Sequence, residues 1–359
     1  MRLLDFSLIK EKTSEFIVIK LREIRRSLRA KLVFIAAKNS WLSILYYCIF
    51  SRKFLRECQA VLQGKVQYHK SLQSDSQYLL KRNIHRLEKG LIMRPFRDVF
   101  AVGYIRETVE NYKNFAQYCK GNEETKDELF WYFSVLDKYF GLTSSHPVID
   151  EVKAVFRAIP AIKDAKILVP YKRYENETSS VSYSDFLELC KQRRSVRWYL
   201  QKPVPRELID QAILAASLSP SACNRQPFEF RIFDKPELVG RIGSIPKGTN
   251  GFHQNFPAIA VVVGKLRAYF DERDRHVIYI DAALATMTFM YALETLSLSS
   301  CPINWPDVEQ QEKEMANLLN LDIDERIVML ISIGFPDPEG LIPYSQKKSL
   351  NKIRRYNLA

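Results

Sequence analysis

The chain has 359 residues, 47% of them hydrophobic and 26% charged, which is typical of a folded globular protein with room for two domains. It has only 12 glycines and no G-x-G-x-x-G motif, and its Gly243–Thr249 segment lacks the lysine of a phosphate-binding P-loop. The six cysteines form no C-x-x-C pair and fit no zinc spacing, so we expect no metal site and a reducing cytoplasmic location.

The net charge of +13 is uneven along the chain. Residues 1–180 hold 32 basic and 20 acidic side chains, whereas residues 181–359 hold 22 basic and 21 acidic side chains. The N-terminal half therefore suits an anionic partner such as membrane lipid, nucleic acid or a phosphorylated substrate, or its charges form a solvated face. We expect no nucleic-acid partner, because the basic half lacks a known nucleic-acid motif and its aromatic residues have the spacing of buried ones.

Residues 15–36 have the periodicity of a basic amphipathic helix. Its apolar stripe comprises Ile17, Leu21, Ile24, Leu28, Leu32 and Ile35. The apolar run 41–50 that follows is too short to span a bilayer. Nothing at the N-terminus resembles a secretory signal. These segments either lie in a membrane interface at the cytoplasmic face or pack against the protein itself.

Residues 76–160 read as further helices, which gives a basic helical region over residues 1–175. His85 and Glu88 share a helix face, and we favour a packed pair over two metal ligands. Gly90 is expected to stop its helix. The polar, serine-rich residues 171–184 are expected to be a linker.

The second half alternates predicted helices and strands around a small sheet, an α+β or α/β arrangement. A helix capped by Ser184 or Asp185 runs to about Arg193, and another begins at Pro205 and ends before Pro220. Strands are expected at 228–233, 258–263 and 326–333, and an amphipathic helix at 307–319. Residues 279–298 are apolar almost all round, which predicts a buried central helix.

Four elements of this half carry candidate chemistry. Three guanidiniums and a hydroxyl at Arg193, Arg194, Ser195 and Arg197 can hold a phosphate dianion. The segment 219–227 begins at the end of a predicted helix. It contains small residues and then the carboxamides of Asn224 and Gln226, whose donors and acceptors suit the edge of a heterocycle. The third element is 298–305, after the central helix. The fourth is Gly334-Phe335-Pro336 followed by Lys347 and Lys348.

In this order and spacing, the four elements resemble the nitroreductase family of FMN-dependent oxidoreductases over residues 185–352. The resemblance implies an α+β nitroreductase-like fold in an intertwined homodimer, with FMN at the subunit interface and NADH or NADPH as co-substrate. The implied contacts to the phosphate, ribityl chain and ring edge are Arg193, Arg194, Ser195 and Arg197, with Lys347 or Lys348 completing the phosphate site. The implied contacts from the other subunit are Pro220, Ser221, Ala222, Asn224 and Gln226.

The resemblance further implies that Pro302, Ile303 and Asn304 present backbone groups near the flavin N5 and O4 edge, and that Asn250 touches its pyrimidine end. We expect Arg197 or a lysine to stabilise the reduced flavin electrostatically, and no side chain stands out as a general acid. Trp305 stands where the family commonly has a small residue, so we expect it to cover the flavin face and narrow the substrate pocket.

The helical extension with its H-R-L-E-K-G-L segment resembles those of family members linked to cell-surface polysaccharide production. The expected function is hydride transfer between NAD(P)H and a small organic substrate. The alternative is a flavin-binding or scaffold protein of the same fold that has lost turnover.

Overall fold

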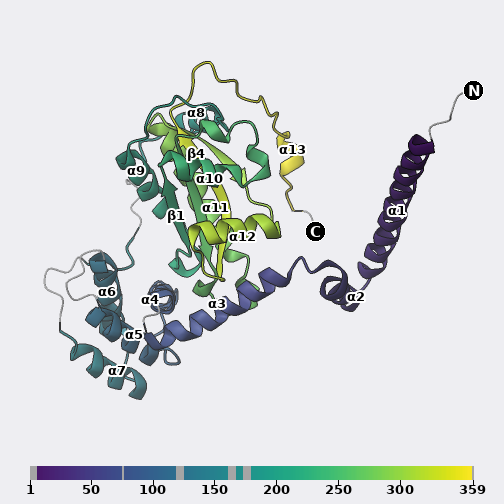
Figure 1. Cartoon of the computed structure of the whole chain (residues 1–359). Helices are drawn as coiled ribbons and strands as arrows, with labels where there is room; N and C mark the ends of the chain where they lie inside the picture. The colour runs from purple at the N-terminus through teal and green to yellow at the C-terminus, as the bar shows by residue number, and fades with distance from the viewer. Residues whose placement is uncertain (1–5, 75–76, 119–124, 161–166, 173–178, 358–359) are drawn as a thin grey trace, which may run out of the picture. The chain divides into compact units, whose positions relative to one another are not determined.

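The computed structural model describes residues 6–74, 77–118, 125–160, 167–172 and 179–357, with side chains from residue 18 onward except 71–74. The chain divides into two compact units, residues 1–59 and 60–359 (Figure 1). The boundary expected near residues 175–185 stays a prediction.

The first unit is helical. Helix α1 (Phe6–Ala36) confirms the expected amphipathic helix and extends it toward the N-terminus, although the side chain of Ile17 lies outside the described ones. Helix α2 (Ser40–Tyr46) and a π-helical turn (Tyr47–Ser51) form the apolar run. The Asn39 side chain caps α2 by accepting from the Trp41 N–H at 2.8 Å.

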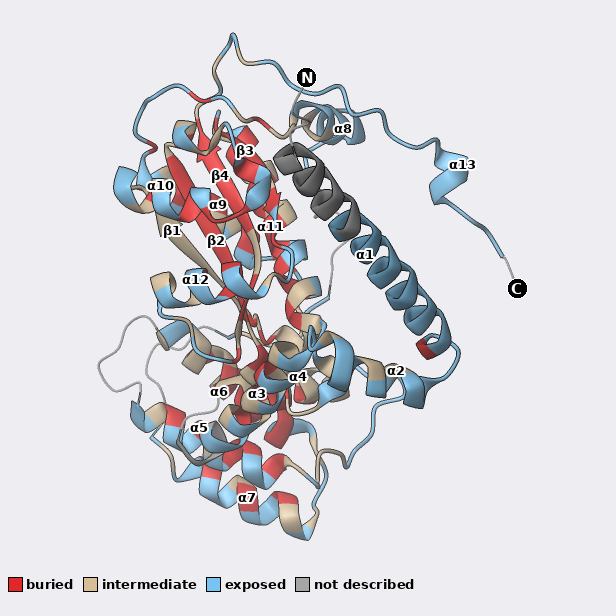
Figure 2. Ribbon diagram, turned by 45° about the vertical axis from the view of Figure 1, so that its right-hand side comes forward, coloured by how far each residue is buried: buried red, intermediate tan, exposed pale blue. Residues whose placement is uncertain are grey.

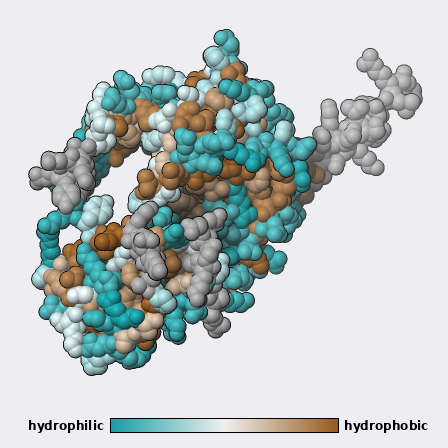
Figure 3. All heavy atoms as spheres, turned by 90° about the vertical axis from the view of Figure 1, so that its left-hand side faces the viewer, coloured by the Kyte–Doolittle hydropathy of each residue, from teal (hydrophilic) through white to brown (hydrophobic). Residues whose placement is uncertain are grey.

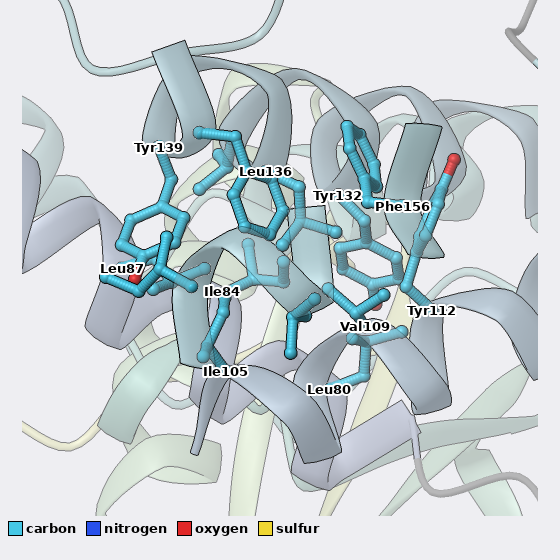
Figure 4. Packing of buried hydrophobic residues seen from close by; sticks show 14 of the residues in the cluster. Leu80, Ile84, Leu87, Ile105, Val109, Tyr112, Tyr132, Leu136, Tyr139 and Phe156 are labelled. Atoms are coloured by element: carbon cyan, nitrogen blue, oxygen red, sulfur yellow. The ribbon is translucent and has the colours of Figure 1, made fainter. Parts of the chain in front are cut away.

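The second unit begins within α3 (Leu55–Ser74), which we did not predict, and continues with four further helices. These are α4 (Gln77–Leu91), α5 (Ile105–Tyr118), α6 (Lys126–Leu142) and α7 (Pro147–Arg157). They enclose one core built from leucine, isoleucine and aromatic side chains (Figure 4). Its fully buried members include Ile84 and Leu87 from α4, Ile105 and Tyr112 from α5, and Tyr132, Leu136 and Tyr139 from α6.

Gly90 does not stop its helix, since α4 runs to Leu91. A Cβ at Gly90 would lie 2.1 Å from Cε2 of Phe100, whose ring packs edge-on against Tyr139. The glycine is therefore required by this close approach rather than by a helix end. His85 and Glu88 form a packed pair: His85 Nδ1 lies 3.4 Å from Glu88, which also accepts from Trp131 Nε1 at 2.9 Å.

A four-stranded antiparallel sheet lies at the centre of the C-terminal part, in the order β1-β2-β4-β3. The strands are β1 (Phe228–Phe233), β2 (Ala258–Lys265), β3 (Ser299–Asn304) and β4 (Glu325–Gly334). Three of them match the expected strands, while β3 was not predicted. Because every pairing among these four strands is antiparallel and the helices lie outside the sheet, the fold is α+β, as expected.

Helices cover both faces of this sheet (Figure 2). On one face, α9 (Arg206–Ser217) and α11 (Val277–Thr295) pack against Ala260, Val262 and Ile331. On the other, α10 (Pro236–Ser244) and α12 (Glu309–Leu319) pack against Ile259, Val261 and Leu330. The alternation of β2 and β4 side chains between the two cores fixes the register of these strands.

Helix α8 (Tyr183–Gln192) is capped by Ser182 instead of Ser184 or Asp185. Ser182 Oγ accepts from the Asp185 N–H at 3.1 Å, and the Asp185 carboxylate accepts from the Ser182 N–H at 3.2 Å. This reciprocal capping box places Asp185 at the third helical position. In the expected linker, the described residues preceding Tyr183 form no helix or strand, and residues 173–178 lie outside the described ones.

Helices α3 and α4 also contact the sheet-bearing part. One apolar cluster joins Ala60 to Leu266, Ala268, Tyr269 and Ile278, with Tyr78 and Ala222 packed against it. A Cβ at Gly64 would lie 2.8 Å from Leu266 Cβ, and Lys65 Nζ lies 2.7 Å from Glu272 Oε1. Helices α3 and α4 thus pack against the connection between β2 and α11.

The central helix α11 is apolar on all sides but buried on one side only. Ala282, Ala285, Phe289 and Leu293 are fully buried, whereas Ile280 is 57% and Leu284 45% exposed. Among the described residues, the segment Glu272–Thr295 alone is long and apolar enough to cross a membrane, and 44% of it is buried. Its contacts with the sheet make it a core helix. Figure 3 shows hydrophobic residues intermixed with hydrophilic ones on one face of the molecule.

Candidate cofactor site

A basic pocket forms where α8 ends. Arg193 is the C-cap of α8, and the chain then runs extended, with Ser195 bridged in parallel to Ser300 of β3 and the Val196 N–H donating to the Ser300 carbonyl at 3.1 Å. A cavity of about 170 Å³ opens here. It is lined by Arg193, Arg194, Ser195, Arg197, Ile342, Pro343, Ser345 and Lys347. Four predicted phosphate ligands and Lys347 thus meet in one pocket, whereas Lys348 does not line it.

The three arginines of this pocket are not equivalent. The Arg194 guanidinium donates to the carbonyls of Pro343 and Tyr344, so it holds the C-terminal arm, residues 335–357, against the pocket. Arg197 donates to the Ser195 carbonyl at 3.2 Å, with its guanidinium 5.7 Å from the Phe252 ring. Within the described part of the chain, the buried Nε of Arg193 has no hydrogen-bond partner. A buried guanidinium nitrogen without an acceptor among the described residues, with other cations around it, fits an anionic ligand such as the FMN phosphate.

The loop between α9 and β1 carries the second group of predicted residues. It contains the 3₁₀ turn η3 (Ala222–Asn224), and Cys223, Asn224 and Gln226 have φ of 54°, 50° and 51°. These left-handed conformations cost about 1 kcal/mol or more per residue. The Gln226 N–H donates to Ser221 Oγ at 3.0 Å and its amide to Asn224 Oδ1 at 3.2 Å. The loop is therefore a strained but internally bonded structure, with Pro220 exposed beside it.

Two side chains of α11 hold this loop. Thr288 Oγ1 lies 2.9 Å from Ser219 Oγ, and Asp281 accepts from the Ala222 N–H at 3.0 Å. Tyr269 donates to the same Asp281 oxygen at 3.0 Å. Burial raises the pKa of Asp281, opposed by these two hydrogen bonds and by Arg225. Sequence reasoning missed the role of Asp281, although a lone acid inside an apolar helix was the signal that could have shown it.

None of the described hydrogen bonds of this loop reaches the basic pocket of the same chain. Among the described residues, the two groups of predicted cofactor residues are thus not hydrogen-bonded to each other within one chain. This arrangement agrees with the expectation that the loop serves the flavin of a partner subunit, an expectation that stays a prediction.

Strand β3 lies at the edge of the sheet, so one side of its backbone is left unpaired by other strands. Pro302 is half-buried, Ile303 buried and Asn304 exposed. Pro302 fits an edge because it lacks an N–H to donate. These three residues follow Ser300, the residue of β3 that is bridged to Ser195. Their backbone groups therefore lie on the strand that adjoins the basic segment, where the flavin ring is expected.

Trp305 does not cover an open flavin face. Its indole is 8% exposed, packs in the core cluster with Ile303 and Met315, and donates to Glu312 Oε1 at 2.5 Å. The expectation that it narrows the substrate pocket is wrong, because the indole N–H has its partner inside the core.

Asn250 follows the 3₁₀ turn Lys247–Thr249 and is exposed. Phe252, two residues later, is the ring beside Arg197. The segment thus lies near the pocket, but no described contact joins Asn250 itself to the pocket, so its role stays a prediction.

Glu294 of α11 was not predicted to belong to this region. It is 7% exposed, with Ser299 Oγ donating to Oε2 at 3.4 Å and Oε1 buried without a partner among the described residues. Burial raises its pKa to about 7, against the opposing effects of Ser299 and the Arg193 charge. An ionisable carboxyl thus lies close enough to Arg193 to sense its charge.

Residues 190–250 and 244–335 match the model of the Nitroreductase family. The chain is 26% identical over 194 residues to iodotyrosine deiodinase of Thermotoga neapolitana, covering 47% of this chain and 96% of that protein. It is 22% identical over 218 residues to iodotyrosine deiodinase 1 of Rattus norvegicus, covering 52% of this chain and 74% of that protein.

Among solved structures, an FMN-dependent nitroreductase of Clostridium difficile is similar, at 24% identity and a TM-score of 0.41, over 48% of this chain and 99% of that one. The family match falls on the residues that form the sheet, α9 to α12 and the basic segment after α8. It supports placing this part of the chain in the nitroreductase family.

Proposed function

We propose that residues 183–359 bind FMN and catalyse the reduction of a small organic substrate with NADH or NADPH. The observation that carries the proposal is the basic pocket, in which the buried Arg193 Nε finds no acceptor among the described residues and Arg197 and Lys347 line the same cavity. When bound, FMN would supply two-electron chemistry between a nicotinamide and an organic acceptor.

The protein's own residues would bind and orient the cofactor. Arg193 and Lys347 would neutralise the phosphate, and the edge of β3 beyond Ser300 would present backbone groups to the ring. A cation such as Arg197 would favour negative charge on a reduced ring, because electrostatic stabilisation is strong where water is excluded. In this proposal the protein positions the cofactor and supplies the positive charge around its phosphate and ring.

The proposal includes an obligate homodimer. Large exposed apolar side chains on α8, α9, α11 and the C-terminal arm support it, because a partner subunit would remove them from water. They include Phe186, Leu187, Leu214, Leu218, Ile280, Leu284, Leu341 and Tyr344. In such a dimer the Ser221–Gln226 loop of one subunit would complete the site of the other.

A titration and a spectrum test the function. FMN added to the purified full chain should bind with quenched fluorescence, and NADH or NADPH added without oxygen should then bleach the flavin absorbance. Absence of FMN binding would overturn the proposal. Binding without bleaching would favour the scaffold alternative. Because two similar proteins are named iodotyrosine deiodinases, iodotyrosine belongs with quinones and nitroaromatics among the acceptors to be compared. The link to polysaccharide production stays a prediction.

A further inference from the structure

The segment 18–54 exposes an unusual amount of apolar surface. On α1, Ile24 and Leu28 are 55% and 56% exposed, and Val18, Leu21, Leu32 and Ile35 are exposed with them. In this segment only Ala36 is buried. A stripe of this kind is unfavourable in water unless something covers it.

A second apolar element follows directly. The α2 helix and the π-helical turn expose Trp41 at 74%, and Leu45, Ile49, Phe50 and Phe54 are also exposed. The Ser43 hydroxyl donates to the Ala36 carbonyl at 2.7 Å, which ties the start of α2 to the end of α1. The rings of Tyr47 and Phe54 pack at 4.5 Å, and Tyr46 packs against Tyr47 and Phe50, so these four rings form one group.

The charge of the same segment is one-sided. Residues 18–54 contain nine basic side chains and one acidic side chain, Glu23. On α1, Arg22, Arg25 and Arg29 flank the apolar stripe on one side and Lys20 and Lys31 on the other, by the 100° step of a helix. This combination of an apolar stripe, flanking basic residues and aromatic rings fits the interface of an anionic bilayer. There the aliphatic parts of Lys and Arg side chains and the aromatic rings lie at the depth of the lipid headgroups.

We propose that residues 18–54 bind peripherally to the surface of an anionic lipid bilayer, without spanning it. Ser40–Ser51 is too short to span a bilayer, which takes about 20 residues, and α1 carries a basic residue at nearly every turn. Nucleic acid would satisfy the charges but leave the apolar stripe exposed. This inference does not depend on FMN binding, so either can fail alone.

Co-sedimentation of the full chain tests the proposal. The chain should pellet with vesicles of phosphatidylcholine mixed with phosphatidylserine, and more weakly with pure phosphatidylcholine or at high salt. Each basic residue near an anionic surface is worth about fivefold in binding, so Arg25→Glu with Arg29→Glu should weaken it about 25-fold or more. The matched control is Lys235→Glu with Arg241→Glu, two exposed charges of α10, which should bind like the parent.

A depth measurement separates lipid contact from charge attraction alone. Brominated lipid should quench the fluorescence of Trp41, and Trp41→Phe should remove that part of the quenching. The proposal is overturned by equal binding to neutral and anionic vesicles, by parent-like binding of the Arg25/Arg29 variant, or by absent Trp41 quenching. Self-association through this segment in place of vesicle binding would overturn it as well.

Discussion

Asp281 of α11 accepts a hydrogen bond from the backbone N–H of Ala222 at 3.0 Å. The bond joins the central helix to the loop that carries Ser221, Asn224 and Gln226. Three left-handed residues in that loop need an external restraint, and Asp281 supplies one from a helix fixed on the sheet.

Asp281→Ala should therefore destabilise the protein and loosen the loop. The substitution leaves the Ala222 N–H and the Tyr269 hydroxyl without their acceptor, at a cost of about 1–3 kcal/mol for each buried group. Urea unfolding and FMN titration should show a lower midpoint together with weaker binding. Asp281→Asn, which keeps an acceptor oxygen, should be milder. Parent-like behaviour of the alanine variant would remove Asp281 from this role.

Arg197→Ala should weaken FMN binding by about 1.5–3 kcal/mol, the range for hydrogen bonds to a charged group. Lys348→Ala is the matched control, since Lys348 lies outside the pocket lining. Fluorescence titration of both variants measures the difference. An equal dissociation constant for parent and Arg197→Ala would show that this guanidinium does not contact the cofactor.

Glu294 should make folding stability depend on pH. Its pKa is raised from 4.5 to about 7, so between these values the folded state binds more protons than the unfolded state. Stability should then fall as pH rises through this window, by roughly 1–3 kcal/mol, and Glu294→Gln should flatten the fall. Urea midpoints across the window test this, with Glu237→Gln as an exposed control. An unchanged slope in Glu294→Gln would contradict the assignment.

Leu284→Glu should prevent dimer formation. Leu284 lies on the exposed side of α11, and a carboxylate there could not be buried against a partner subunit without a large desolvation cost. Sedimentation velocity should show a monomer that retains its helix content but has lost tight FMN binding. Ile323→Glu, at an exposed position just after α12, is the control. A dimer with full FMN content in Leu284→Glu would place the interface elsewhere.

Gly90→Ala should destabilise the helical core by about 1–3 kcal/mol, the usual cost of overpacking, because its Cβ would overlap the Phe100 ring. Phe100→Ala opens the space, so the double variant should lose less stability than the sum of the two single variants. Additive losses in chemical unfolding would show that the two residues do not meet.

Periodicity predicted the elements whose burial is regular. The continuous β-branched run of β2 and the stripe of α9 are local signals, and both elements formed where expected. Strand β3 was missed because Ser299–Asn304 contains serines and a proline, and it is a strand through pairing with distant β4. The sequence likewise placed Arg193 and Lys347 in one site by resemblance. Asp281 and Glu294 stand out in the sequence as acids inside an apolar helix, but the groups that they contact depend on helix packing that no short pattern shows.

The cluster that joins Ala60, Tyr78 and Ala222 to Leu266 limits how this protein can be trimmed. Removing residues 1–91 to leave a minimal flavin domain would strip the apolar cover from Leu266, Ala268 and Tyr269 and remove Lys65 from Glu272. Tyr269 also holds Asp281, so solvent would reach the hydrogen bonds that restrain the Ala222 loop. A shortened chain would thus expose apolar side chains at the β2–α11 connection and be prone to aggregate. The helical extension is therefore needed for the stability of the sheet-bearing part.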